Sequence, residues 1–126
     1  RWPFYPGTGT AAETGTGAGL GATINVPIAF GTPRGDYEHA LKSAIDELAT
    51  RMKPQLILLS AGFDAHRLDP VGSLNLEVED FVWMTQYVRQ VADEYCQGDL
   101  VSMLEGGYNT EILPQCVEVH LRELLA

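Results

Sequence analysis

An apolar run in the middle of the chain constrains the fold more than any other feature. Residues 56–61, Leu-Ile-Leu-Leu-Ser-Ala, follow Pro54 and lead directly into Gly-Phe-Asp-Ala-His at 62–66. A short apolar run bounded by proline and glycine favours a strand covered on both faces over a helix. Such a strand delivers Asp64 and His66 to its own carboxyl end, which is where open α/β sheets keep their active sites.

The segments around this strand alternate between strand and helix patterns. After a loop over 1–21, the predicted order is a strand (22–28), a helix (36–52), the central strand (56–61), a helix (77–97), a strand (100–104) and a last helix that begins near Thr110 or Pro114. Asp36 is expected to cap the first helix. The alternation implies an α/β fold, with a parallel sheet flanked by helices, in one domain over 1–126. Asp64 and Tyr108 then reach the same edge of the sheet, because each follows a parallel strand.

Length and charge narrow the partners that the chain can have. Its 126 residues allow one domain with a core of its own. Eight basic and seventeen acidic residues give a net charge of −9, which opposes nucleic-acid binding and favours a cationic substrate. No apolar run is long enough to span a membrane. Cys96 and Cys116 lack the spacing of a metal or redox motif, which indicates free thiols in a reducing cytoplasm.

The amino-terminal loop is rich in glycine and shows neither a helical nor a strand period. Residues 17–22 match the dinucleotide-binding pattern GxGxxA. That fingerprint needs a strand before it and a helix after it, whereas here a polar loop precedes and a predicted strand follows. The tract is therefore interpreted as a flexible linker or as a loop whose backbone passes close to another group.

Three motifs, taken together, resemble one known family. They are Pro-Gly-Thr-Gly at 6–9 with Asn-Val-Pro at 25–27, Ser-Ala-Gly-Phe-Asp-Ala-His-Arg-Leu-Asp-Pro-Val-Gly at 60–72, and Leu-Glu-Gly-Gly-Tyr-Asn at 104–109. In this order they resemble the zinc-dependent histone deacetylase family, especially bacterial members called acetoin utilisation or acetylpolyamine deacetylases. The resemblance covers essentially all 126 residues, but only the C-terminal portion of that family's domain. It implies the C-terminal part of an arginase/deacetylase-like fold.

The resemblance assigns the main catalytic positions. Asp64 matches the family's last zinc ligand, and a carboxylate oxygen suits Zn²⁺. Tyr108 matches the tyrosine whose hydroxyl donates to the acetyl carbonyl and then to the oxyanion. Gly106 and Gly107 match substrate-binding positions, where a sharp backbone turn lets the tyrosine ring face inward. Without the flanking motifs, Asp64 would be interpreted as a helix cap or loop acceptor, and Tyr108 as a surface turn residue.

Two further positions are assigned to the substrate tunnel. Tyr5 matches the aromatic residue that walls the acyl-lysine tunnel, usually phenylalanine. Val71 falls where many members have leucine at the tunnel mouth, so this mouth is expected to be slightly wider. The implied substrate is an acetylated amine or acetyl-lysine, which agrees with the acidic charge of the chain.

Three polar residues are interpreted as supports of the site. His66 lies two residues beyond Asp64 and could point the same way on a strand as a second ligand. Because the family's zinc-binding Asp-x-His pair lies upstream, His66 is interpreted as structural or as a support for the ligands. Asp69 is interpreted as a turn acid. Glu105 is expected to orient the Tyr108 loop by hydrogen bonding.

Several of the family's functional residues have no counterpart in this sequence. The tandem His-His acid-base pair and the Asp-x-His zinc ligands are absent from the 126 residues. His39 and His120 fall in amphipathic segments and are interpreted as structural or exposed. The chain alone therefore offers one of the expected zinc ligands and is expected to be inactive. The resemblance also implies a structural potassium ion.

The sequence thus predicts the C-terminal part of a zinc-dependent deacetylase that hydrolyses acetyl-lysine or acetylpolyamine amides. It is expected to form a homo-oligomer or to pair with the missing N-terminal portion. The alternative is a non-catalytic truncated module that self-associates or complements an N-terminal half, because a half-sheet leaves strand edges and an apolar face without partners. A third hypothesis is a ureohydrolase-like dimanganese enzyme, whose clustered Asp and His ligands this sequence does not contain.

Overall fold

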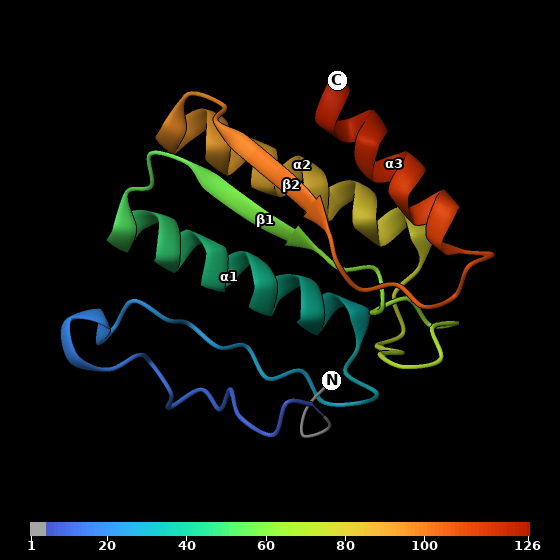
Figure 1. Ribbon diagram of the computed structural model, residues 1–126, viewed down its shortest axis with the longest axis horizontal. Helices are drawn as coiled ribbons and strands as arrows, with labels where there is room; N and C mark the ends of the chain where they lie inside the picture. Colours follow the sequence, from blue (N-terminus) through green and yellow to red (C-terminus); the bar gives the residue numbers. More distant parts are fainter. Residues whose placement is uncertain (1–4) are drawn as a thin grey trace.

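The computed structural model describes residues 5–126, in which helices and strands alternate (Figure 1). A 3₁₀ turn (Gly17–Gly19) is followed by α1 (Arg34–Met52), β1 (Ile57–Ala61), α2 (Val78–Cys96), β2 (Leu100–Leu104) and α3 (Leu113–Leu125). This order confirms the predicted α/β fold with a parallel sheet and flanking helices. Within residues 5–126, no helix is long and apolar enough to cross a membrane.

The two strands pair in parallel, in register from Ile57 opposite Leu100 to Ala61 opposite Leu104. Helix α2 connects them and lies behind the sheet in Figure 1. Because both strands run in the same direction, the loops that follow Ala61 and Leu104 leave the sheet at the same edge. The bounds of β2 are those predicted, and β1 begins one residue later than predicted.

The strand predicted over 22–28 is not present within the described part of the chain. This segment is extended and lies beside the amino-terminal loop (Figure 1). The Asn25 side chain donates to the carbonyl oxygens of Thr10 (3.1 Å) and Glu13 (2.8 Å) and so joins the two segments. Extended backbone becomes a strand only where a second strand pairs with it, which apolar patterning alone does not reveal.

The glycine tract folds into a tight loop, as one of its two interpretations expected. Gly15 has a φ of +105°, and a Cβ atom at this position would lie 2.1 Å from the carbonyl oxygen of Gly19. The Gly21 N–H donates to the Thr14 carbonyl at 2.8 Å and closes the loop. Only glycine fits at residue 15, because both the φ angle and the contact exclude a side chain.

Helix α1 begins at Arg34 with Pro33 as its N-cap, so the prediction that Asp36 caps this helix is wrong. The Pro33 carbonyl accepts the first helical hydrogen bond from the Tyr37 N–H at 3.0 Å. Proline suits a helix start because it has no N–H to leave unpaired. Asp36 lies in the first turn, where its charge interacts favourably with the positive end of the helix dipole.

Helix α2 begins with a capping box. The Glu77 side chain accepts from the backbone N–H of Asp80, and the Asp80 carboxylate accepts from the backbone N–H of Glu77 at 2.7 Å. Asp80 also accepts from Arg34 of α1 (2.8 Å) and from the Trp83 indole (3.1 Å). Burial raises the pKa of Asp80, but Arg34 and the other donors outweigh this effect and hold it below its usual range. One carboxylate therefore ties the first turns of α1 and α2 together.

The core lies between the sheet and helices α2 and α3, and it is centred on Ala61, Phe63, Phe81 and Cys116. The rings of Phe63 and Phe81 meet at an angle of 60°, with centroids 5.1 Å apart. Burying each phenylalanine contributes about 1.5–3 kcal/mol. Both cysteines are buried free thiols, as predicted. Burial raises the pKa of Cys116 to about 11, which keeps this thiol in its unreactive protonated form.

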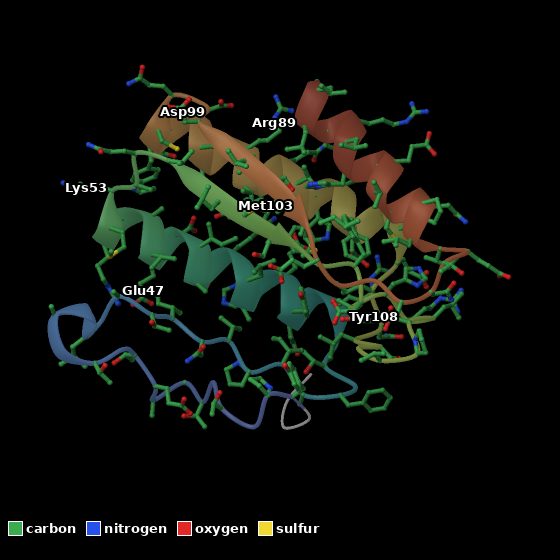
Figure 2. All side chains as sticks on the ribbon, viewed as in Figure 1. Glu47, Lys53, Arg89, Asp99, Met103 and Tyr108 are labelled. Carbon is green, nitrogen blue, oxygen red and sulfur yellow. The ribbon has the colours of Figure 1, made fainter. Side chains whose placement is uncertain are left out.

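One face of the sheet is uncovered within residues 5–126. Burial alternates along β1, so that Ala61 is buried on the inner face while Leu58 is 63% exposed on the outer face. Val101 and Met103 of β2 are exposed on the same outer face, and Met103 is labelled in Figure 2. The prediction of a strand covered on both faces is therefore wrong for the described residues, in which α2 and α3 pack against the inner face.

His120 joins α3 to both α2 and β2. Its Nδ1 lies 2.7 Å from Thr85 Oγ1, and its Nε2 lies 2.8 Å from Ser102 Oγ. Because Thr85 donates its hydroxyl hydrogen to the Phe81 carbonyl (2.6 Å), it accepts from Nδ1–H of His120. Nε2 is then the acceptor for Ser102, and the imidazole is neutral. Burial lowers the pKa of His120. Of its two interpretations, structural or exposed, the buried position and the two hydrogen bonds bear out the structural one.

This depressed pKa predicts a fold that weakens in mild acid. The stability contributed by neutral His120 is present above the unfolded pKa of about 6.5 and is lost as pH falls through the lower folded pKa. We expect the free energy of unfolding in urea to fall between pH 7.5 and pH 5, by at most about 1.4 kcal/mol per pH unit for one proton. His120→Gln should make the fall in unfolding free energy with pH shallower. His39→Gln, at an exposed position of α1, should not. Equal slopes in all three proteins would contradict the assignment.

Candidate active site

The candidate site is built from the two loops that leave the same edge of the sheet. The Glu105 N–H donates to the Ala61 carbonyl at 3.0 Å, and the Phe63 N–H donates to the Gly106 carbonyl at 2.8 Å. These bonds continue the pairing of β1 and β2 beyond the strands. The parallel sheet thus brings the loops that carry Asp64 and Tyr108 together, as the order of elements predicted.

Asp64 is half-buried and is enclosed by glycines. A Cβ atom at Gly106 would lie 2.7 Å from Asp64 Oδ1, and one at Gly62 would lie 3.0 Å from the same oxygen. A Cβ atom at Gly72 would lie 2.1 Å from the Asp64 carbonyl oxygen. A side chain at any of these three positions would crowd the carboxylate or its backbone, so glycine is needed there to leave room for Asp64.

Tyr108 follows a glycine that turns the backbone sharply. Gly107 has a φ of +134°, in the region that favours glycine, and a Cβ atom there would lie 2.7 Å from Leu113 Cδ1. The Tyr108 backbone N–H donates to Asp69 Oδ2 at 2.7 Å. The Tyr108 side chain is 56% exposed, so its placement depends on the backbone more than on packing (Figure 2).

Asp69 is more than a turn acid. Its side chain is buried, and Oδ1 accepts from the backbone N–H groups of Val71 (2.8 Å) and Gly72 (2.9 Å), which is the predicted turn. Its second oxygen reaches the other loop and accepts from Tyr108. Burial raises the pKa of Asp69, but these backbone donors outweigh it and hold the pKa below its usual range, so the group is a carboxylate at neutral pH.

His66 does not point at Asp64 as a second ligand. Its Nδ1 accepts from the Leu68 N–H at 3.1 Å, and its Nε2 lies 3.8 Å from the Glu77 carboxylate. Burial lowers the pKa of His66, although Glu77 acts in the opposite direction. Both ring nitrogens therefore serve the loop between β1 and α2, in agreement with the structural interpretation.

Glu105 bonds to the neighbouring strand. Its Oε1 accepts from Ser60 Oγ at 3.0 Å, across the ends of β1 and β2. The Glu105 side chain thus bonds to β1, and its expected role in orienting the Tyr108 loop stays a prediction. The side chain is otherwise exposed.

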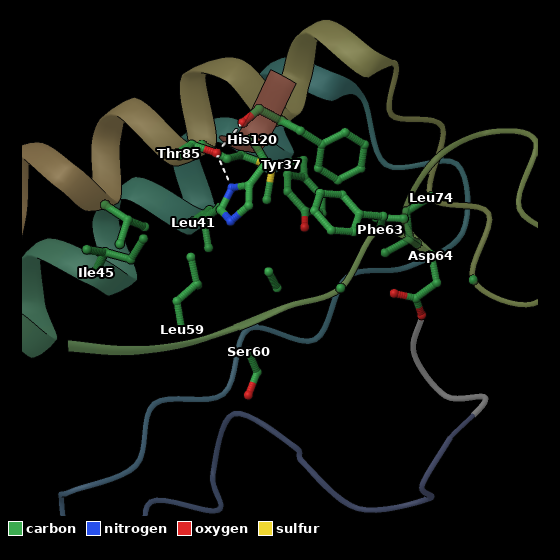
Figure 3. A pocket seen from close by; sticks show the side chains of 17 residues that line it. Tyr37, Leu41, Ile45, Leu59, Ser60, Phe63, Asp64, Leu74, Thr85 and His120 are labelled. Atoms are coloured by element: carbon green, nitrogen blue, oxygen red, sulfur yellow. Dashed lines mark hydrogen bonds between the residues drawn. The ribbon is translucent and has the colours of Figure 1, made fainter. Parts of the chain in front are cut away.

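A cavity of about 370 Å³ lies between α1, α2 and β1, with Asp64 at one end and Ile45 at the other (Figure 3). Its walls are mainly apolar, and they include Tyr37 and Leu74. Burial raises the pKa of Tyr37, and the negative charge of Asp64 acts in the same direction. The partly buried Asp64 side chain therefore borders an apolar cavity on one side and solvent on the other.

The two predicted tunnel residues are both on the surface. Tyr5 is 80% exposed and borders a hollow of about 330 Å³ together with Tyr37 and Leu74, which also line the Asp64 cavity. Val71 is 40% exposed and lies beside Gly72 in the Asp69 turn. Tyr5 is therefore near the Asp64 side of the site through shared neighbours, and the tunnel role of both residues remains a prediction.

Sequence reasoning missed four residues that shape the site. They are Gly62, Gly72, Tyr37 and Asn109. The glycines stand within the motif around Asp64, and Asn109 directly follows Tyr108, so their places in the motifs were the available signal. Tyr37 had no such signal, because helical spacing marks it only as an apolar position.

Residues 5–126 do not by themselves form a zinc site. Nowhere in this range do three or more His, Cys, Asp or Glu side chains gather so that they could hold a metal ion. A catalytic zinc takes about three protein ligands, and the predicted set in this chain consists of Asp64 alone. Further ligands would have to come from outside the described residues.

The model of the histone deacetylase domain matches residues 1–124. The chain belongs to the histone deacetylase family. It is 42% identical over 125 residues to histone deacetylase 10, chloroplastic, of Oryza sativa subsp. japonica. This match covers 96% of this chain and 27% of that protein. It is 41% identical over 111 residues to a probable deacetylase of Archaeoglobus fulgidus, covering 88% of this chain and 31% of that protein.

Solved structures agree with the family assignment. The acetylpolyamine aminohydrolase from Burkholderia pseudomallei matches with a TM-score of 0.82 and 27% identity, over 98% of this chain and 34% of that chain. The chain therefore has the fold of the corresponding part of deacetylases of this family. It spans about a third or less of the length of the relatives that it matches.

The enclosure of Asp64 predicts that glycine is required at residue 106. Gly106→Ala would place Cβ 2.7 Å from Asp64 Oδ1, and the resulting shift should lower the free energy of unfolding by about 1–3 kcal/mol. The matched control is Gly35→Ala in α1, where a Cβ atom meets nothing within 4 Å. Its stability should be unchanged or raised by about 0.5–1 kcal/mol. Urea unfolding of both variants checks this, and similar losses in the two would contradict the crowding argument.

Proposed function

We propose that this chain forms the C-terminal part of a zinc-dependent deacetylase domain that releases acetate from an acetylated amine. The observation that carries the proposal is the meeting of the Asp64 and Tyr108 loops at one edge of the sheet. Membership of the histone deacetylase family supports the class of reaction, an amide hydrolysis. The buried free thiols fit a reducing compartment, and we place the enzyme in the cytoplasm.

In this proposal Asp64 supplies one oxygen ligand to the metal. Gly62 and Gly106 leave room for its carboxylate, and its apolar cavity side leaves the outer side for a ligand. Zinc, when bound, polarises the acetyl carbonyl and lowers the pKa of a water molecule. The remaining ligands and the histidine pair that takes up and returns the proton belong to the part of the domain outside this chain.

Tyr108 stabilises the charge that forms on the substrate. As water adds to the acetyl carbon, the carbonyl oxygen becomes an oxyanion, and the Tyr108 hydroxyl donates a hydrogen bond to it. The C–N bond then breaks, acetate forms, and the amine leaves with a proton. A donor aimed at such an oxyanion lowers the barrier by about 3–4 kcal/mol. The turn at Gly107 and the bond to Asp69 hold the backbone that carries this donor.

The substrate proposed is an acetylated amine that carries positive charge elsewhere in the molecule, either acetyl-lysine in a basic peptide or an acetylpolyamine. A net charge of −9 attracts a cation and repels a polyanion such as nucleic acid. The structural relative named as an acetylpolyamine aminohydrolase supports this class of substrate. Tyr5 and Val71 would form part of the entrance, and the hollow bordered by Tyr5 lies next to the cavity that ends at Asp64.

The rest of the deacetylase domain is the proposed partner of the uncovered sheet face. Leu58, Val101 and Met103 form an apolar surface that isolated soluble domains seldom expose. The relatives are three to four times longer than the matched region, which provides enough chain to cover it. The same face supports the alternative function, a non-catalytic module in which two copies associate through this surface.

The catalytic proposal predicts a specific effect at Tyr108. In the full-length zinc-loaded protein, Tyr108→Phe should lower kcat for an acetyl-lysine peptide by about 10²–10³-fold, because the oxyanion loses a donor. Asp64→Ala should lower both zinc content and turnover. Tyr95→Phe, whose hydroxyl contacts Thr50 of α1, is the control and should leave kcat unchanged. Full activity of Tyr108→Phe would rule out the proposed role.

The two uses of the sheet face differ in their expected oligomeric state. If copies associate through this face, sedimentation of the 126-residue chain should show a dimer that Leu58→Lys with Met103→Lys converts to a monomer. If the face belongs to the rest of the domain, the same double substitution should destabilise the full-length protein. A monomeric 126-residue chain would argue against the self-associating module.

A further inference from the structure

The buried carboxylate of Asp69 divides its two oxygens between the two loops of the site. Oδ1 accepts from Val71 and Gly72 of its own loop, and Oδ2 accepts from the Tyr108 N–H. We propose that Asp69 is a positioning residue, which holds the Tyr108 backbone so that the phenol reaches the reacting acetyl group. This inference rests on the deacetylase function proposed above and extends it to a residue that itself does not contact substrate.

The second oxygen is what distinguishes this residue from an ordinary turn acid. A turn of this kind needs one accepting oxygen, which asparagine or serine also provides. A buried carboxylate is tolerated only when its oxygens are well paired, and here both are. The bond to Tyr108 therefore explains why a full carboxylate, rather than an amide or hydroxyl, suits residue 69.

Asn109 holds the other side of the Tyr108 backbone. Its Nδ2 donates to the Leu68 carbonyl at 2.9 Å, and its Oδ1 accepts from the N–H groups of Glu111 (3.0 Å) and Ile112 (3.2 Å). The backbone around Tyr108 is thus tied to the first loop at two points, by the Tyr108 N–H to Asp69 and by the Asn109 side chain to Leu68. With its own side chain 56% exposed, Tyr108 takes its position from these backbone restraints.

The substitution Asp69→Asn distinguishes the two roles of the carboxylate, which are to accept from the turn at Val71 and Gly72 and to accept from Tyr108. An amide has one accepting oxygen, and if this oxygen keeps both Val71 and Gly72, the NH₂ group faces the Tyr108 N–H, a donor opposite a donor. The turn then survives while Tyr108 is released. Asp99→Asn makes the same chemical change at an exposed acid and serves as the matched control.

The first measurement follows the Tyr108 amide by NMR in the full-length protein labelled with ¹⁵N-tyrosine. Tyr108→Phe assigns the signal by removing it. In Asp69→Asn we expect this amide signal to move upfield and its hydrogen exchange to accelerate by about tenfold or more, since a bond to a charged acceptor is lost. Unshifted signals from Tyr37 and Tyr87 would show that the fold is intact. An unchanged Tyr108 amide would overturn the inference.

The second measurement asks whether the restraint matters for turnover in the zinc-loaded enzyme. A misplaced donor should lower kcat by about tenfold or more. KM should stay within about twofold, because the substrate-binding surface is unaltered. Zinc content should match the wild type, which excludes damage at Asp64. Wild-type kcat in Asp69→Asn would overturn the positioning role, even if the amide signal moves.

The two measurements also separate this inference from the proposed function. If the wild type shows no turnover, the deacetylase proposal fails, and the amide signal still decides whether Asp69 restrains Tyr108. If Asp69→Asn does not fold, Asp69→Ser replaces it, since serine provides one acceptor for the turn and removes the oxygen that accepts from Tyr108. Lower kcat with retained KM would then support the restraint, and an unchanged kcat would overturn it.

Discussion

The parallel pairing of β1 with β2 is the interaction on which the site depends. Its register sends the chain out of both strands at one edge, and the bond from Phe63 to Gly106 continues the pairing into the loops. The core anchors the same place, because Phe63 packs on Phe81 immediately before Asp64. A shift of this register would separate Asp64 from Tyr108, so strand pairing and site geometry are one constraint.

The fold class, the helices and the second strand could be predicted from the sequence because each has a local signal. Local patterns predicted a helix over 77–97 and a strand over 100–104, close to α2 and β2 as observed. The strand over 22–28 and the cap at Asp36 were wrong for a shared reason. Strand pairing and the choice between Pro33 and Asp36 depend on neighbours that a local pattern does not contain.

The site was predictable in its residue types and less so in its connections. Motifs pointed to Asp64, Tyr108, Gly106 and Gly107. Nothing in the spacing of Asp69 indicated a bond to a residue 39 positions away. His66 was interpreted correctly as structural, but its spacing did not indicate its partners, which are the Leu68 N–H and the Glu77 carboxylate. Contacts between loops are a property of the folded chain, and the sequence shows only which groups are able to make them.

The long-range bonds of the site also determine when it can form. Proteins are synthesised from the N-terminus, and Asp64 and Asp69 leave the ribosome well before Tyr108 and Asn109, which lie 39 or more residues further along. Until β2 has emerged, the first loop has neither Gly106 nor Tyr108 to pair with. The two loops can therefore meet only after β2 has been synthesised, so the growing chain carries Asp64, the proposed metal ligand, before it carries the residue proposed to complete the chemistry.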